Sequence, residues 1–402
     1  MKFLIKILLE NEKDKNFKKL RFCWLFIAIL TSIPFSFSSN VNFYSINSMY
    51  GVSMRETVTV IKDDNGFVWT SSKTGIMRLT EHDYRIYELP YVTADIISVH
   101  LIYRDKQLLS YTNNGQIFSY NEIYDRFDLL TDLRSITNDS FIVVHSMQID
   151  VHGNLWISTS IGLYKYQKGE LLLINNESTD IDNNVWYDDQ HLVYATSHGL
   201  WMINIETLVV RKLCKTTEYL LQVTEFYNDK QKQRLWVGTN SSGLFYYDFI
   251  NNTFSPTSIK SFPRQPILAI ASNSDSTLLI GVDGQGILEI NRDGTKILNT
   301  YNEDVDNPTS LRGDGVYDIF CDENNRIWVC TYSGGVSYFD QNSPLVNKIV
   351  HQINNPNSLT NNNVNKVLED SQGNMWFATN NGVCCWDVKT DRWKVYFHDK
   401  HE

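Results

Sequence analysis

A short phrase recurs eight times along the chain and sets the repeat unit of the fold. It consists of a polar turn, a Trp or aliphatic residue, a small residue or Thr shortly after it, and then a Gly, as in GNLWISTSIGLYKY (153–166). The Trp-equivalent positions lie 37 to 49 residues apart, and they are Trp69, Leu109, Trp156, Val193, Trp236, Leu279, Trp328 and Trp376. A period of about 43 residues is typical of stacked repeats, either propeller blades or paired-helix solenoids.

The residues inside one unit favour strands over helices. In residues 316–340, apolar and β-branched residues alternate with period 2 and are interrupted by Asp-Glu-Asn-Asn and by Ser-Gly-Gly, which predicts a three-strand meander with tight turns. The aromatic content of 13% fits strands as well. One further strand is expected between copies, for example over 85–90, 127–130 or 345–352. Four strands per unit predict an all-β fold, a β-propeller of four-stranded blades.

Two forms of the ring agree with eight copies. One is a seven-bladed propeller followed by the start of a second propeller, and the other is a single eight-bladed ring. Residues 41–47 resemble the segment 346–352, so each unit is expected to begin with the outer strand of the preceding blade. The strand at 41–47 would then pair with the last blade and remove the exposed edge of the ring.

The frame residues have structural roles in this interpretation. The Trp-equivalent side chain is expected to pack between adjacent blades, and the small residue after it, such as Gly238 or Gly281, suits a crowded position. Asp in the Asp-x-x-Gly turns is expected to cap the turn by accepting hydrogen bonds from its own backbone. The repeat therefore builds blades and assigns no chemistry by itself.

The N-terminus reads as a targeting segment. Seven Lys and Arg against three acidic residues in the first 21 positions precede the apolar run FCWLFIAIL (22–30) and small residues, which predicts an export signal cleaved after Ser38 or an uncleaved membrane anchor. The predicted division is residues 1–38 as signal peptide or anchor, 39–344 as the seven-repeat propeller, and 345–402 as an eighth repeat that is either an eighth blade or the start of a second propeller. The predicted location is the periplasm, with any membrane attachment made by this segment or by a C-terminal span beyond residue 402.

Charge and cysteine content exclude several classes of site. Without the first 38 residues the chain has 29 Lys and Arg against 43 Asp and Glu, a net charge of −14, which repels phosphate backbones and argues against nucleic acid as a partner. The five remaining cysteines form no C-x-x-C or Cys/His pattern, so buried thiols are expected rather than a disulfide framework or a zinc site. No motif for a metal or another cofactor occurs.

The motifs resemble the two-component regulator propeller repeat of bacterial hybrid two-component sensors. DSQGNMWFATNNGVCCWD (370–387) carries the blade pattern, and DNPTSLRGDGV (306–316) and NNPNSLTNNNV (354–364) carry the interblade pattern Asn-x-Pro-x-Ser-Leu. The likeness spans roughly residues 41–400, although the second, fourth and sixth copies lack the Trp.

This resemblance implies a periplasmic propeller that senses oligosaccharides from polysaccharide breakdown. Family members typically contain two seven-bladed propellers, a β-sandwich, a membrane span, a histidine kinase, a receiver and a DNA-binding domain. The present chain lacks the phosphoacceptor His motif and the receiver acidic cluster, so no kinase activity is expected of these residues. It therefore resembles a truncated sensor or a stand-alone propeller, and the resemblance leaves a homodimer open.

Other functions remain as alternatives. A constitutive protein-interaction scaffold would use the same repeats, because a fold does not determine a function. A propeller glycosidase or lyase is a further alternative, as is a quinoprotein dehydrogenase, but no acid/base pair stands out from the turn carboxylates. No catalytic residue is therefore predicted.

Ligand binding is expected on the face that carries the loops after each second strand and the loops between blades. These loops are long and rich in Asn, Asp, Tyr and Trp, and concave sites with aromatic and polar groups suit sugars. The predicted ligand-binding residues are Tyr91, Trp186, Tyr187, His198, Tyr219, Arg264, Asp283, Arg312, Asp314 and Tyr332.

Overall fold

The computed structural model describes residues 41–80, 83–92, 95–96, 98–174, 180–215, 222–273, 275–341 and 349–397. The predicted export segment lies outside these residues, as does the predicted boundary at 344/345. In the part of the chain that is described, no helix is long and apolar enough to cross a membrane.

Each repeat folds into one four-stranded antiparallel sheet, so the predicted all-β fold with four-stranded blades is confirmed. The innermost strands of the first seven sheets are β2 (Thr57–Lys62), β6 (Val99–Arg104), β10 (Val144–Ile149), β14 (Ile181–Trp186), β18 (Val223–Asp229), β22 (Ile267–Ser272) and β26 (Val316–Cys321). The second strands are β3 (Val68–Ser72), β7 (Gln107–Thr112), β11 (Leu155–Thr159), β15 (His191–Thr196), β19 (Arg234–Thr239), β23 (Thr277–Val282) and β27 (Arg326–Thr331).

The outer half of each sheet follows the same order. The third strands are β4 (Gly75–Leu79), β8 (Gln116–Asn121), β12 (Gly162–Gln167), β16 (Gly199–Asn204), β20 (Leu244–Asp248), β24 (Gly286–Asn291) and β28 (Gly335–Asp340). The outermost strands are β5 (Tyr84–Tyr87), β9 (Arg126–Asp132), β13 (Glu170–Leu173), β17 (Val210–Lys215), β21 (Thr253–Pro256), β25 (Ile297–Tyr301) and β1 (Tyr44–Ser45). Two short helices, α3 (Ile46–Tyr50) and α4 (Leu133–Thr137), lie in the connections before blades 1 and 3.

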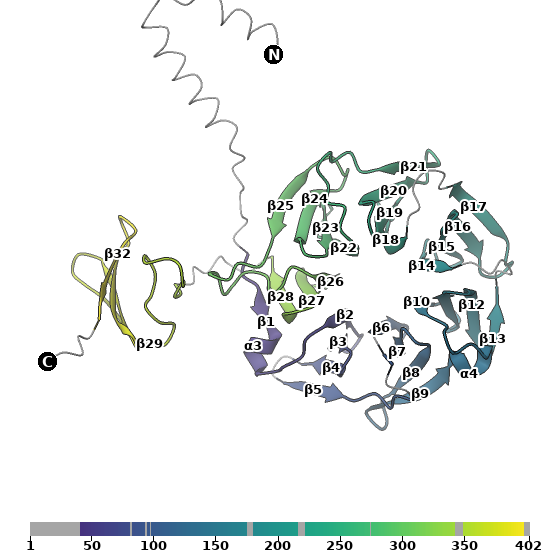
Figure 1. Ribbon diagram of the computed structural model, residues 1–402, viewed down its shortest axis with the longest axis horizontal. Coiled ribbons are helices and arrows are strands. Elements are labelled where there is room, and N and C mark those ends of the chain that lie inside the picture. Colours follow the sequence, from purple (N-terminus) through teal and green to yellow (C-terminus); the bar gives the residue numbers. More distant parts are fainter. Residues whose placement is uncertain are drawn as a thin grey trace, which may run out of the picture. The chain divides into compact units, whose positions relative to one another are not determined.

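Seven blades close the ring (Figure 1). Each innermost strand contacts the innermost strand of the next blade, and β26 contacts β2. β1 supplies the outermost strand of blade 7 by pairing with β28, Tyr44 opposite Tyr338. The prediction that residues near 41–47 seal the last blade is confirmed, and the alternative of an eight-bladed ring is wrong because the seventh sheet already meets the first.

The eighth repeat forms a sheet of its own with strands β29 (Val364–Glu369), β30 (Met375–Thr379), β31 (Gly382–Asp387) and β32 (Arg392–Tyr396). A strand was also expected over 345–352, and its described part, 349–352, is not in a strand. The outer edge of blade 7, which such a strand would need as a partner, is occupied by β1.

The core of the ring lies between blades rather than within them. Seven hydrophobic clusters each combine residues of two neighbouring blades. Trp69, Trp156 and Trp236 are almost fully buried in three of these clusters, which confirms the predicted position of the repeat Trp. The small residue after the Trp is required by close approach: a Cβ on Gly238 would lie 2.7 Å from Ile267 of the next blade.

The turn Asp and the repeat Trp are linked by a hydrogen bond. Asp150 accepts from the backbone N–H groups of His152 and Asn154 and from the indole Nε1 of Trp156 at 3.1 Å. The same indole-to-carboxylate bond joins Trp69 to Asp63, Trp328 to Asp322 and Trp376 to Asp370. The Asp therefore caps the first turn, as predicted, and also orients the Trp that packs against the next blade.

Candidate ligand-binding cavity

A central cavity of about 780 Å³ lies between the innermost strands, and all seven blades line it. Most of its lining residues lie on the innermost strands, and Tyr111 lies on the second strand β7. Glu56 and Ser98 lie just before two of these strands, and Lys73 and Tyr332 lie in turns between second and third strands. The cavity therefore opens on the face formed by these second turns and by the loops between blades, which we call the interblade-loop face. The other face carries the first and third turns of each blade, and we call it the first-turn face.

A β-bulge shapes the wall of the cavity. The pairing of the innermost strand shifts between its first and third residues in every blade of the ring except blade 2. Bulges redirect side chains and strengthen the twist of a strand. Here the bulge brings polar side chains at the second and third strand positions to the neighbouring blade.

Polar contacts between innermost strands surround the cavity. The N–H of Val60 donates to Asp318 Oδ2 of blade 7 at 2.8 Å, and the N–H of Asn184 donates to Ser146 Oγ of blade 3 at 3.0 Å. The inner edge of a blade has no strand partner, so its N–H groups need such acceptors. Asp318 and Ser146 are both third residues of their strands.

Glu225 occupies the same third position in blade 5. Burial, together with the nearby charge of Asp318, raises the pKa of Glu225 to about 8. Burial also raises the pKa of Asp318, to about 6, against the opposing effect of the hydrogen bond from Val60. At pH 7 Asp318 is thus mostly ionised and Glu225 is mostly protonated.

Two aromatic pairs complete the lining. Tyr317 and Tyr332 stack near the opening with ring centroids 6.1 Å apart, and His100 stacks on Tyr111 at 5.0 Å. Burial lowers the pKa of His100 to about 4 and raises the pKa of Tyr111. The imidazole is therefore neutral at pH 7, and the cavity offers aromatic faces beside hydroxyl, amide and carboxyl groups. No cluster of three or more metal-ligating side chains occurs among the described residues.

Comparison with known proteins identifies the repeats. The sequence profile of the family described as two component regulator propeller matches residues 310–333 and 358–381. Two of the eight repeats thus match this family. The matched segments contain the Ser-Leu pair before an innermost strand and the repeat Trp after it, at blade 7 and at the eighth sheet.

Solved structures show the same propeller fold. One is described as the extracellular domain of a hybrid two-component system from B. thetaiotaomicron, with 18% identity, a TM-score of 0.59, and coverage of 89% of this chain and 49% of that one. Another, described as the extracellular domain of a one-component system from B. thetaiotaomicron, gives 20% identity, a TM-score of 0.61, and coverage of 88% and 54%. The chain thus spans about half the length of these extracellular domains.

A propeller enzyme is similar as well. An inactive form of virginiamycin B lyase from Staphylococcus aureus, solved with quinupristin, has 13% identity and a TM-score of 0.60, with coverage of 75% of this chain and 99% of the lyase. At these identities the likeness establishes the fold alone. No curated protein matches the chain in sequence.

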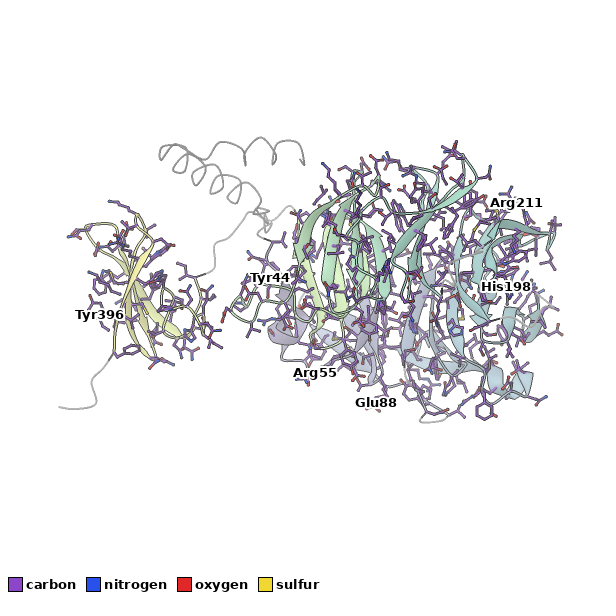
Figure 2. All side chains as sticks on the ribbon, turned by 45° about the horizontal axis from the view of Figure 1, so that its top comes forward. Tyr44, Arg55, Glu88, His198, Arg211 and Tyr396 are labelled. Carbon is purple, nitrogen blue, oxygen red and sulfur yellow. The ribbon has the colours of Figure 1, made fainter. Side chains whose placement is uncertain are left out.

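The seven-bladed ring brings only part of the predicted binding set to its cavity. Tyr332 lines the cavity, and Asp283 lies close enough to Tyr317 to raise the pKa of that phenol. Arg264 and His198 (Figure 2) lie on the interblade-loop face, in the loop before blade 6 and the second turn of blade 4, and do not line the cavity. Tyr219 falls outside the described residues.

Three predicted residues hold loops of the ring. The Tyr91 hydroxyl donates to the carbonyl of Lys73 at 3.2 Å, and Arg312 Nη2 donates to the carbonyl of Pro308 at 2.9 Å. Asp314 accepts from the N–H of Glu303 at 2.6 Å. Their polar groups are therefore engaged in shaping the interblade loops.

The predicted face is wrong for Trp186 and Tyr187. Trp186 ends the innermost strand β14, and Tyr187 begins the first turn of blade 4, so both lie at the first-turn face. Tyr187 instead lines a separate groove between blades 4 and 5, where its ring lies 4.4 Å from that of Phe249. Chain direction reverses at each strand, which places the first and second turns of a blade at opposite ends.

Sequence reasoning missed most of the cavity lining. Glu225, Asp318, His100, Tyr111 and Tyr317 were not predicted, although all lie on innermost or second strands that face the cavity. The available signal was a carboxyl at the third position of an innermost strand, because Asp318 interrupts the apolar strand β26 and Glu225 occupies the same position in β18.

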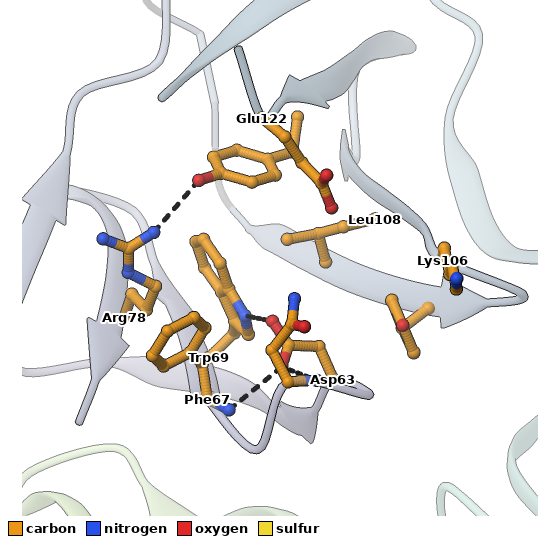
Figure 3. A pocket seen from close by; sticks show the side chains of 10 residues that line it. Asp63, Phe67, Trp69, Arg78, Lys106, Leu108 and Glu122 are labelled. Atoms are coloured by element: carbon orange, nitrogen blue, oxygen red, sulfur yellow. Dashed lines mark hydrogen bonds between the residues drawn. The ribbon is translucent and has the colours of Figure 1, made fainter. Parts of the chain in front are cut away.

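A smaller pocket of about 220 Å³ on the first-turn face lies between blades 1 and 2 (Figure 3). The Arg78 guanidinium lies 4.9 Å from the ring centroid of Phe67 and donates to the Tyr120 hydroxyl at 3.0 Å. The Trp69 indole donates to Asp63 in the same pocket. These groups bond to one another across the two blades, so the pocket serves as a contact between blades.

Proposed function

We propose that the chain is a periplasmic sensing propeller that binds an oligosaccharide in its central cavity, as the input region of a two-component sensor. The observation that carries this proposal is the cavity of about 780 Å³ with stacked tyrosines at its opening and polar side chains from six of the seven blades. Sugars present apolar ring faces and hydroxyl groups, so they suit sites that combine aromatic faces with hydrogen-bonding groups.

The periplasmic location and the signalling role rest on the repeats and on the similar extracellular domains. A ligand contributes to signalling only through different affinities for two arrangements of the protein. A ligand that touches several blades at once would favour one arrangement of the ring relative to a partner protomer or to further domains of a sensor. We also propose that the eighth sheet is the start of a second propeller.

Calorimetric titration of the full chain with a panel of neutral and charged oligosaccharides tests the proposal. We expect heat of binding for at least one of them. Tyr332→Ala should weaken that binding about fivefold, because an aromatic stacking contact contributes about 1 kcal/mol. Tyr124→Ala is a matched control, since Tyr124 is 66% exposed in the third turn of blade 2, on the first-turn face.

The absence of heat for every oligosaccharide would overturn sugar sensing and leave the interaction scaffold as the better function. A second candidate, hydrolysis or elimination of a glycan, is favoured by one observation. Glu225 and Asp318 have pKa values of about 8 and about 6 in the same cavity, as an acid and a base require. Release of reducing ends during the titration would support an enzyme, and loss of that release in Asp318→Asn would assign it to the cavity.

A further inference from the structure

The Glu225 carboxyl lines the central cavity and has no cationic partner among the described residues. Its pKa is affected by burial, by Asp318 and by the N–H of Phe226, and by no Lys, Arg or His. No side chain among the described residues donates a hydrogen bond to it, whereas Ser146 and Asp318 at the equivalent position each accept one from the next blade. A buried carboxyl of this kind destabilises the empty protein and is available to a ligand.

Tyr111 lines the same cavity as both carboxyls. Burial raises the pKa of its phenol, and the charges of Glu225 and Asp318 act in the same direction. Two carboxyls and an aromatic ring in one cavity form an environment that attracts an ammonium group, through charge and through the negative face of the ring.

The basic side chains that line the cavity do not neutralise Glu225 and Asp318. Lys73 lies in a second turn at the opening. His145 Nε2 pairs with Asp180 at 3.0 Å, and His100 is neutral at pH 7. Glu56 adds a further acidic group at the opening. The lining therefore disfavours uronates and sulfated sugars.

We propose that the cavity prefers a saccharide with a free amine, whose ammonium group binds among Glu225, Asp318 and Tyr111. This inference rests on the proposed function of the cavity and adds the chemical class of its ligand. Because Glu225 is mostly protonated at pH 7 in the free protein, binding of an ammonium ion releases its proton to the buffer and leaves a carboxylate paired with the ligand.

Calorimetry at pH 7 with three matched trisaccharides tests the preference: chitotriose with free amines, its fully N-acetylated form, and cellotriose. We expect chitotriose to bind at least about tenfold more tightly than the other two. Its apparent enthalpy should differ between phosphate and Tris buffers, as release of up to one proton requires. The buffer comparison uses the unmodified protein and so needs no variant.

Glu225→Gln should remove both the amine preference and the proton release while neutral trisaccharides still bind. Glu122→Gln is the matched control, because Glu122 lines the pocket on the first-turn face and should leave both properties unchanged. Equal affinity for all three sugars would overturn the amine preference and leave oligosaccharide sensing intact. An amine preference that survives in Glu225→Gln would overturn the assignment to this carboxyl. Absence of binding by any sugar would reject both proposals.

Discussion

Replacing Glu225 by Gln should stabilise the protein at alkaline pH. The pKa of Glu225 is raised from 4.5 to about 8 in the folded chain, so the folded state holds this proton more tightly than the unfolded state. A raised pKa contributes stability that is fully present below the unfolded value and is lost as pH rises through the folded value. The wild type therefore loses stability between about pH 4.5 and pH 8, and the amide variant does not.

The size of this stabilisation follows from the pKa shift of Glu225. One pKa unit corresponds to about 1.4 kcal/mol, so the full shift gives at most about 4 kcal/mol between pH 5 and pH 9. Water in the cavity reduces the cost of ionisation, and we expect about 2 kcal/mol. Glu225→Gln should thus match the wild type at pH 5 and exceed its free energy of unfolding by about 2 kcal/mol at pH 9.

Urea unfolding followed by tryptophan fluorescence at pH 5, 7 and 9 measures this difference. Glu122→Gln, an exposed Glu on the first-turn face, should show no pH-dependent change relative to wild type. The reasoning would be refuted if the difference in free energy of unfolding between Glu225→Gln and wild type stayed constant from pH 5 to pH 9. Glu225 would then ionise with an ordinary pKa.

Two further substitutions test the contacts between and within blades. Gly281→Ala should lower the free energy of unfolding by about 1–3 kcal/mol, because the new Cβ would lie 2.8 Å from Val316 Cγ1 of the next blade. Gly51→Ala is the control. Its Cβ meets no atom within 4 Å, so this variant should be destabilised only by the left-handed backbone that Gly51 adopts. Asp150→Ala should lower the free energy of unfolding by about 2–4 kcal/mol, because the N–H groups of His152 and Asn154 and the Trp156 indole lose their acceptor. Hydrogen bonds to the Asp150 carboxylate lower its pKa despite the opposing effect of burial, so this contribution is present above the usual Asp pKa and fades as pH falls through the lowered value. Urea midpoints at pH 7 and pH 3 check both substitutions, and unchanged midpoints would contradict them.

The sequence alone determined the blade. Alternation with period 2, the turn residues and the recurring Trp are local features, and each predicted its strand, turn or buried position from neighbours within a few residues. The capping role of Asp150 and the crowding at Gly238 followed from the same local chemistry, and the structure confirms both.

The tertiary structure decided how many blades close the ring and which side chains meet inside it. Closure depends on the pairing of Tyr44 with Tyr338, almost 300 positions away in the chain, and the repeat period alone agrees with seven or eight blades. Glu225, Tyr111 and Asp318 come from blades 5, 2 and 7, so their proximity and their shifted pKa values exist only when the ring is complete. Burial and charge act through space, which is why the sequence identified the loops of the correct face for Tyr332 but not the carboxyls on the inner wall.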